Sequence, residues 1–402
     1  MSLAAKLPYD HPYAGGYPGL SSQALPTDAD ALDYLSRMAT ADGAGVETGV
    51  AIAVDEFISA TKSSGVWDSI RASCILAGAR TLAGALVPLK NEGPELWAEQ
   101  TPTINNADGS AAEWDAATLT MSNTSPTTSI IRPRFDFYVG LEDGKQYRIS
   151  GRLSGDLASI RNSVFRMGNT GSSVDIDPST GLFDSTGTAS GGLLPLLFTF
   201  DGSLGPFSVT IESMSIREVI DDPVNSPVGN GFVSGDYSRT AGLKGDGTSY
   251  LDSGRANNDD PQNDKHISVY STETSGNGVT IGTPALEVGR SALFRSTGLS
   301  QIAFRINADS VGFGGSNTST GLMGASRNQA SNFTARASQS DIIFSAASEA
   351  PSSSALLIYL EEPGSAFACD DRIAFYSIGT SLSLEALDTA VTNLITAIGE
   401  AL

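Results

Sequence analysis

The apolar residues of this 402-residue chain change their spacing near Pro94, and this change constrains the fold most. From Thr27 up to that point they recur at intervals of three and four residues, which is typical of helices. Beyond it they alternate with polar residues in short runs, which is typical of strands with one buried face. We therefore predict a mainly β protein that begins with a small helical part.

The pattern divides the chain into four regions. The length of the chain also favours more than one domain. The predicted regions are an extended arm (1–26), a helical collar for attachment and oligomerisation (27–93), a first β-sandwich (94–222) and a second β-sandwich with a terminal helix (223–402).

The arm carries Tyr9, Tyr13 and Tyr17 at four-residue spacing. Pro8, Pro12 and Pro18 are each adjacent to one of them, and proline removes a backbone donor and fixes φ, so this spacing cannot belong to a helix. Two interpretations stay open, a loose terminus or a peptide that docks on another subunit through its tyrosines.

The helical collar holds three apolar stripes. They run over 32–38, 46–58 and 66–82, so we expect three short helices, the first capped by Thr27 or Asp28. Alanine and glycine are dense at 77–79 and 83–85, and small residues let helices approach closely. On this basis we predict that the protein forms a homotrimer through the collar.

The two sandwiches rest on different signals. In the first, the runs 144–155 and 206–219 alternate, and the second run slips in phase near Ser213 as a β-bulge would require. In the second, Gly-Asp, Asp-Gly and Asn-Gly steps recur as hairpins require. Ser383 can cap a final helix whose apolar face includes Leu387, Val391, Leu394 and Ile398.

Net charge and cysteine content limit the classes of binding partner and the cellular compartment that we expect. The net charge is −21, and a negative field repels nucleic acid and anionic membranes, so we expect neither as a partner. No apolar run is long enough for membrane insertion, and the start lacks the apolar core of a secretory signal. Cys74 and Cys369 are too few for a disulfide framework, which favours synthesis in a reducing cytoplasm.

No catalytic constellation emerges, and we predict that the protein is not an enzyme. His11 and His266 have no partner at the spacing of a catalytic triad or zinc site, and His266 is interpreted as structural. The acid pairs Asp221-Asp222, Asp259-Asp260 and Asp370-Asp371 lie in turn-like contexts, although two carboxylates could serve glycoside hydrolysis. We identify no catalytic, cofactor-binding or metal-binding residue, and the ligand-binding residues stay unknown.

Three local features leave alternatives open. The loop 256–265 is rich in oxygen ligands suited to Ca²⁺, as is 245–254, but neither has the EF-hand spacing, so hairpin turns compete with a calcium site. Trp97 and Trp114 are candidates for stacking on sugar rings or for core packing. The glycine-rich run 312–321 lacks the lysine of a phosphate-binding loop.

Four segments resemble known proteins. The segments 42–89, 232–270 and 372–398 resemble virion-associated tail or head fibre-like proteins of bacteriophages and prophages, the last two as the opening and closing of a concanavalin-like jelly roll. The stretch from YRISGRLSG to SVTIESMSIREV is similar to the galactose-binding-like jelly roll of carbohydrate-binding modules. The resemblance implies fold and membership of a virion, and it supplies no catalytic residues.

We therefore interpret the chain as a virion structural protein, a tail or fibre component made in the bacterial host cytoplasm. It would attach to other virion proteins and display β-sandwiches for host attachment by carbohydrate binding, with host-surface polysaccharide as a ligand. One alternative is a capsid decoration or head-fibre protein with a purely architectural role. Another is a depolymerase of surface polysaccharide.

Overall fold

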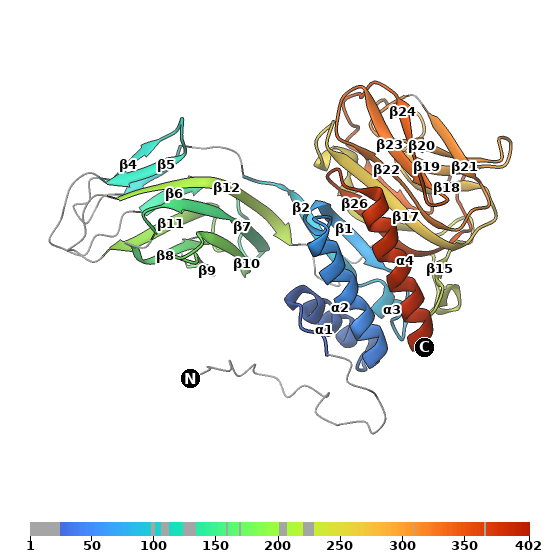
Figure 1. Ribbon diagram of the computed structural model, residues 1–402, viewed down its shortest axis with the longest axis horizontal. Coiled ribbons are helices and arrows are strands. Elements are labelled where there is room, and N and C mark those ends of the chain that lie inside the picture. Colours follow the sequence, from blue (N-terminus) through green and yellow to red (C-terminus); the bar gives the residue numbers. More distant parts are fainter. Residues whose placement is uncertain are drawn as a thin grey trace. The chain divides into compact units, whose positions relative to one another are not determined.

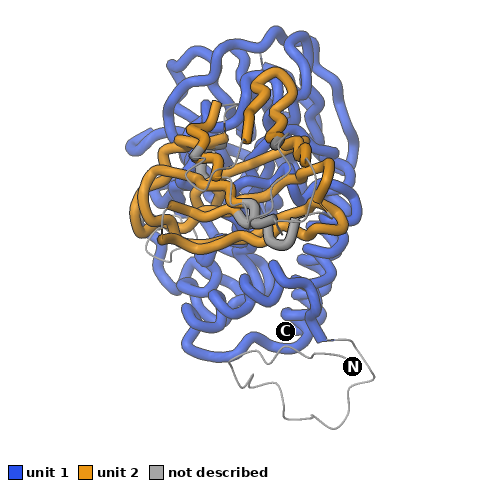
Figure 2. Tube along the Cα trace, turned by 90° about the vertical axis from the view of Figure 1, so that its left-hand side faces the viewer, with its two compact units in different colours: residues 1–90, 221–402 blue, residues 91–220 orange. Residues whose placement is uncertain are grey.

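The computed structural model describes residues 25–97, 101–105, 112–123, 134–157, 160–168, 170–200, 207–219, 229–309, 311–365 and 367–402. The chain forms two compact units, coloured separately in Figure 2. Unit 1 comprises residues 1–90 and 221–402, and unit 2 comprises residues 91–220. Unit 2 is thus inserted into the sequence of unit 1. The predicted arm falls outside the described residues up to Ala24.

The protein is mainly β, as predicted. The helical collar and the second sandwich, which we expected as separate regions, belong to one unit. The first sandwich corresponds closely to unit 2.

Unit 1 contains a sandwich of two antiparallel sheets. The first, called here the covered sheet, has β26 near its middle, with β17 on one side and β1 and β15 on the other. Its strands are β1 (Ile70–Ile75), β14 (Tyr237–Ser238), β15 (Gly242–Lys244), β26 (Arg372–Gly379), β17 (Lys265–Glu273), β22 (Gly321–Arg327), β23 (Asn332–Ala337) and β24 (Ser340–Ser345).

The second sheet of unit 1, called here the open sheet, has seven strands. In spatial order they are β13 (Gly229–Asn230), β16 (Tyr250–Ala256), β25 (Ala355–Ile358), β18 (Gly278–Gly282), β19 (Ala292–Ser296), β20 (Gln301–Arg305) and β21 (Gly312–Ser316). The inner faces of the two sheets share a core that includes Leu251, Leu293, Phe304, Val269 and Met323.

Four α-helices lie in the described part of unit 1, and their core lies on the outer face of the covered sheet. They are α1 (Ala29–Asp42), α2 (Thr48–Ser63), α3 (Leu82–Ala85) and α4 (Leu384–Ala401), and short 3₁₀ turns are η2 (Trp67–Ser69), η5 (Ser234–Asp236) and η6 (Asn257–Asp259). Leu322 and Phe375 from the covered sheet join this second core, where Phe57 of α2 meets Phe375 edge-on at 5.6 Å. Figure 1 shows α2 beside α4.

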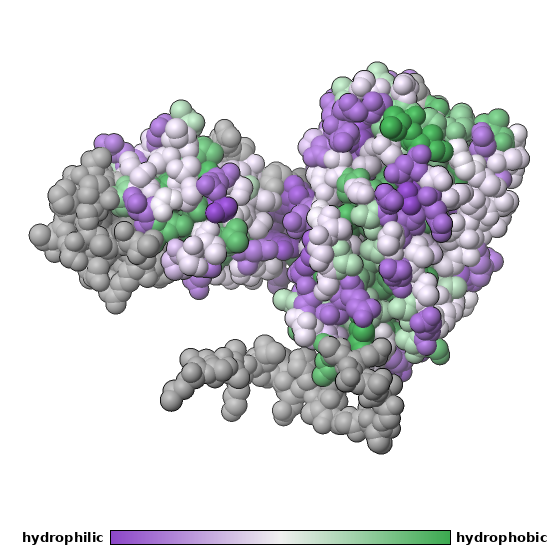
Figure 3. Space-filling view, in the orientation of Figure 1, coloured by the Kyte–Doolittle hydropathy of each residue, from purple (hydrophilic) through white to green (hydrophobic). Residues whose placement is uncertain are grey.

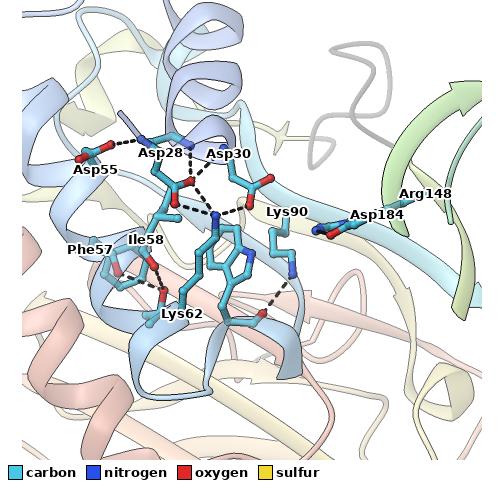
Figure 4. Close-up of polar contacts among 12 residues, drawn as sticks. Asp28, Asp30, Asp55, Phe57, Ile58, Lys62, Lys90, Arg148 and Asp184 are labelled. Carbon is cyan, nitrogen blue, oxygen red and sulfur yellow. Dashed lines mark hydrogen bonds and ion pairs between the residues drawn. The ribbon is translucent and has the colours of Figure 1, made fainter. Parts of the chain in front are cut away.

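Helix α1 begins and ends at residues with the expected capping signals. Asp28 caps α1 by accepting from the backbone of Asp30 and Ala31, and Gly43 ends it in the left-handed conformation. Lys62 of α2 lies between the carboxylates of Asp28 and Asp30, 2.7 Å from each (Figure 4). This contact fastens the start of α1 to the end of α2.

The terminal helix agrees with its prediction. Ser383 accepts from the backbone N–H of Ala386 as the N-cap, at 3.2 Å. The predicted face is buried along α4, including Leu387, Val391, Leu394 and Ile398. In α1 one assignment was wrong, because Leu32 is 38% exposed while Tyr34, Leu35 and Met38 are buried.

The third predicted helix of the collar was wrong. Residues 70–75 form β1, which pairs with β26 at the centre of unit 1. Ile70 and Ile75 enter the helical core, while Ala72 and Cys74 enter the core between the sheets. A strand buried on both faces shows no polar alternation, so its apolar residues can imitate helical spacing by chance.

The small residues of the collar fill the chain's own interior. A Cβ on Gly78 would lie 3.0 Å from a methyl group of Val50, and one on Gly84 would overlap the carboxylate of Asp42. Gly49 likewise lets α2 approach Ala401 at the end of α4. The homotrimer prediction therefore loses its basis in a helical surface of small residues.

Unit 2 is a second antiparallel sandwich. One sheet contains β10 (Leu182–Thr188), β7 (Gln146–Gly155), β12 (Phe207–Val219), β5 (Thr120–Asn123) and β4 (Ala112–Asp115), with β2 (Pro88–Glu95) pairing at the end of β12. The other contains β3 (Thr103–Asn105), β6 (Arg134–Tyr138), β11 (Leu193–Phe200), β8 (Ile160–Arg166) and β9 (Ser173–Asp175). The predicted β-bulge is confirmed, because the β7–β12 register shifts between Ile211 and Ser213.

Candidate functional site

The outer face of the open sheet is the candidate functional site. Among the described residues, the helical core contains no member of this sheet, so helices cover only the other side of the sandwich. Residues paired across antiparallel strands project from the same face. Leu293 and Phe304 pair and lie in the core, so the next pair, Ala292 and Arg305, projects outward.

Two rows of side chains run across this outer face. The first row consists of Asp252, Leu357, Gly282, Ala292 and Arg305, each paired with the next. The second consists of Val279, Phe294, Ala303 and Phe313. Small residues at the centre of each row are thus flanked by charged and aromatic ones.

Arg290 belongs to the same face. Ser291 beside it turns inward, where its hydroxyl exchanges hydrogen bonds with Asn307. Alternation along the chain then directs Arg290 outward, near Arg305. No hydrogen bond or ion pair joins either guanidinium to the described part of the chain, although the Nε atom of each is buried.

The freedom of these two arginines is unusual in unit 1. Carboxylates pair with the guanidinium groups of many other arginines there, at 2.7 to 3.0 Å. These are Arg37, Arg80, Arg239, Arg255, Arg295, Arg336 and Arg372. In a chain with 45 acids against 24 bases, two arginines that form no ion pair with the described residues stand out.

Glu361 lies close to this surface. Burial raises the pKa of its carboxyl, and the Ser365 hydroxyl and the nearby charge of Arg290 oppose that rise. Ser365 donates to Glu361 at 3.2 Å. Phe313, at the edge strand β21, is 39% exposed, and Phe294 is half-buried. The face therefore combines two cations, a carboxyl group and aromatic surface.

The loop 256–265 uses its oxygen atoms internally. Asp260 forms an ion pair with Arg255 at 2.9 Å, and both are buried. Asp259 accepts from the backbone of Ala256, and the ammonium of Lys265 donates to the carbonyl of Asn257 at 2.6 Å. Two buried cations thus stand where a calcium ion would have to bind, and the geometry of this loop gives the calcium interpretation no support.

The remainder of this loop and the loop 245–254 also have structural contacts. Asp264 accepts from the backbone and hydroxyl of Ser381. Asp246 accepts from the backbone and hydroxyl groups of Thr248 and Ser249, and these bonds lower the pKa of its carboxyl to about 2. Among the described residues, no three His, Cys, Asp or Glu side chains form a metal-binding group.

His266 is a structural residue, as interpreted from the sequence. It lies in β17 and is fully buried, with Nδ1 2.6 Å from the Thr380 carbonyl and Nε2 3.0 Å from the Ser377 hydroxyl. Burial lowers the pKa of its imidazole to about 4. His11 lies outside the described residues.

The acid pairs of the described segments have structural contacts and do not come together as a pair in a cleft. Asp371 forms a fully buried ion pair with Arg295 at 2.7 Å, and Asp370 accepts from the Ser275 hydroxyl. Asp221 and Asp222 lie outside the described residues. The glycine-rich run 312–321 begins with β21, where Gly312 and Gly314 leave room for the rings and methyls of Phe344 and Ile342.

Trp97 and Trp114 lie together in unit 2. Both meet the ring of Phe137 edge-on, at 5.2 and 5.7 Å between ring centroids, and both pack against the core of the sandwich. The Nε1 atom of Trp114 is buried without a partner among the described residues. The contacts support core packing for these two tryptophans over sugar stacking.

The two cysteines are buried thiols. Cys74 donates to the carbonyls of Ala85 and Val87, and Cys369 lies in the core between the sheets. Burial raises the pKa of both thiols, so they are poor nucleophiles.

Comparison with known proteins gives distant structural matches. No protein family model and no curated sequence matches the chain. Among solved structures, the mouse laminin alpha1 chain, domains LG4-5, aligns with a TM-score of 0.27 at 11% identity, covering 72% of this chain and 93% of that one. A sialidase of Trypanosoma rangeli in complex with sialic acid aligns with a TM-score of 0.27 at 9% identity, covering 74% and 53%. At this level the similarities say nothing about ligand or activity.

The sequence did not single out the residues of the outer face. Arg290, Arg305 and Glu361 lie in three separate segments, and only the folded chain brings them to one face. The one local signal is the Phe-Arg step in β20, because neighbouring residues of a strand point to opposite faces, which places Arg305 on the face opposite Phe304. Separately, no helix among the described residues is long and apolar enough to cross a bilayer.

Proposed function

We propose that this protein is a bacteriophage virion component, of the tail or a fibre, that displays β-sandwiches for adhesion to host-surface glycans. The observation that carries the adhesion is the outer face of the open sheet. There Arg290 and Arg305 form no hydrogen bond or ion pair with the described residues, and Phe294 and Phe313 project from the same face. Sugars combine hydroxyl and acidic groups with apolar C–H faces, and such a surface offers a partner for each. The resemblance of residues 42–89, 232–270 and 372–398 to virion proteins supports the location.

Adhesion by such a surface gains from many copies. A single shallow contact is weak, but copies held on one particle act together, and the effective concentration of each further contact is then high. Attachment to other virion proteins would use the N-terminal arm (1–26), because the collar helices bury their apolar faces within unit 1.

Two measurements test this proposal with the full chain. An antibody against the protein should label phage particles in electron microscopy at the tail or its fibres. The purified protein, added in excess to host cells, should reduce particle adsorption. Labelling confined to the capsid would replace the tail location by the head-fibre alternative, and unchanged adsorption would leave an architectural role.

A further inference from the structure

We infer that the outer face of the open sheet binds an acidic sugar residue, whose anionic group is held between Arg290 and Arg305. This inference rests on the proposed glycan adhesion and names the class of ligand. It depends on the contacts of two side chains, on the neighbours that surround them and on the charge of the whole chain.

The first step concerns the hydrogen-bond donors of the two guanidinium groups, which have no acceptor among the described residues. Each guanidinium presents five donors, and neither group donates to the described residues although the Nε atom of each is buried. Buried donors in folded proteins are almost always satisfied by protein, water or ligand. An acceptor from outside the chain would complete these two groups.

The second step is the geometry that two adjacent guanidinium groups offer. Arg305 projects beside Ala292 from the neighbouring strand, and Arg290 precedes Ala292 by two residues on the same face. Planar guanidinium groups bind carboxylate and sulfate by paired parallel hydrogen bonds, which a lysine cannot form. One anionic group can therefore bridge both arginines.

The third step is the surroundings, which fit a sugar better than a free anion. Gly282, Ala292 and Ala303 are buried beneath the larger side chains that flank them, so a ligand on this face would contact the guanidinium groups and the rings, and not the backbone of the sheet. Phe294 and Phe313 offer apolar surface for the C–H face of a sugar ring. Glu361, whose pKa is raised by burial, can donate to or accept from a ring hydroxyl.

The fourth step is specificity. The net charge of −21 disfavours non-specific binding of acidic polymers to most of the surface. An acidic polymer that binds this protein must therefore find a local positive site. The unpaired arginines of this face provide one, because the other cations of unit 1 named above are neutralised by carboxylates.

The test measures binding of the full-length protein to three polymers at physiological salt. Polygalacturonate offers carboxylates, dextran sulfate offers sulfates, and dextran is neutral. We expect at least one acidic polymer to bind, and the R290A and R305A variants to weaken that binding at least tenfold. R305K should also weaken it, because lysine keeps the charge and loses the fork. The preferred acidic polymer then distinguishes carboxylate from sulfate recognition.

The matched control is R152A in unit 2. Arg152 is an exposed arginine paired with Glu212 at 3.3 Å, so its removal makes the same change in net charge. Equal weakening by R152A would show a general charge effect and overturn the inference. Binding of dextran alone, or acidic binding that R290A and R305A leave unchanged, would also overturn it while adhesion to glycans stands. Absence of binding to all three polymers, with unchanged particle adsorption, would overturn the proposed function as well.

Discussion

The two faces of the open sheet use arginine in opposite ways. On the inner side, Arg255 and Arg295 are fully buried, and each has a carboxylate partner, Asp260 and Asp371. On the outer side, the guanidinium groups of Arg290 and Arg305 form no hydrogen bond or ion pair with the described residues. Removing a buried partner leaves an uncompensated charge, whereas a partly exposed arginine can be solvated. The comparison separates arginines that hold the sandwich together from arginines that are available to a ligand.

Arg327 is a further arginine between the two sheets, and backbone carbonyls take the place of a carboxylate as its partners. It is fully buried and has no carboxylate, and its guanidinium donates to the carbonyls of Ile306, Gln329, Ala330, Asn332 and Ala346. These carbonyls come from several loops at one end of the sandwich. Even without a carboxylate, Arg327 is therefore held by the chain through its Nε and Nη1 atoms.

The largest expected effect is the loss of an inner arginine. Arg295→Ala should destabilise unit 1 by about 3–5 kcal/mol, because Asp371 would remain buried without its partner. Urea unfolding followed by circular dichroism measures the change. Arg295 also donates to the carbonyls of Asn317 and Ser319, so the connection between β21 and β22 should loosen as well.

A double variant provides the control for that prediction. Replacing both Arg295 and Asp371 by apolar residues of similar size removes the unpaired charge, and it should restore much of the lost stability. A small effect of Arg295→Ala alone, below about 1 kcal/mol, would contradict the division between inner and outer arginines.

The second effect concerns pH and the buried His266. The unfolded imidazole takes up a proton near pH 6.5, while the folded one does so only near pH 4. Between these values the unfolded state binds the extra proton, so the free energy of unfolding falls as the pH falls, by about 3 kcal/mol in total. Desolvation is the main cause, and Arg255 and Lys265 add to it while Asp260 and the Thr380 carbonyl oppose it.

Unfolding measured at pH 7 and pH 4.5 tests this prediction. His266→Gln should lose most of the pH dependence in that window, whatever it does to stability at pH 7. Carboxyl groups such as that of Asp28, whose pKa is lowered in the fold, titrate at more acidic pH in both proteins. The same slope in both proteins would show that other groups carry the pH dependence.

The third effect concerns the helices that distinguish the covered sheet from the open one. Ser383→Ala removes the N-cap of α4 and should destabilise unit 1 by about 1 kcal/mol. Ser383→Asp keeps an acceptor at the cap and should be close to neutral. Thermal unfolding of both variants measures the difference, and equal loss in the two would mean that the cap hydrogen bond contributes little.

The sequence predicted the elements whose signals are local. The cap and the buried face of α4, the alternation of β7 and β12, and the bulge near Ser213 all depend on neighbouring residues. In the collar, a local signal led to a wrong assignment. Val66, Ile70 and Cys74 fit a helical period, but burial on both faces made residues 70–75 a strand.

The candidate site lay beyond sequence reasoning for a related reason. The composition of loop 256–265 suggested a calcium site. In the structure, Arg255, just before the loop, forms an ion pair with Asp260, and Lys265, the last residue of the loop, donates to the carbonyl of Asn257. The outer face has no compositional signal, because Arg290, Arg305 and Phe313 are ordinary residues of separate strands and loops. The face is distinguished by two arginines that form no ion pair with the described residues, and recognising them requires the strand register of the whole sheet.

Replacing the outer arginines should have the smallest effect on stability. This effect tests whether the inner and outer arginines differ in their structural role. Arg290→Ala and Arg305→Ala should each change the free energy of unfolding by about 0.5 kcal/mol or less, because no carboxylate or carbonyl of the described chain loses a partner. Arg305 pairs with Ala292 on the neighbouring strand, so a small loss from packing of its aliphatic part is included in that range. Urea unfolding of both variants beside Arg295→Ala gives the measurement under one condition. If the outer variants were as damaging as the inner one, the two guanidinium groups would have to be part of the framework of the sandwich, and their lack of partners could no longer be taken as a sign of a ligand.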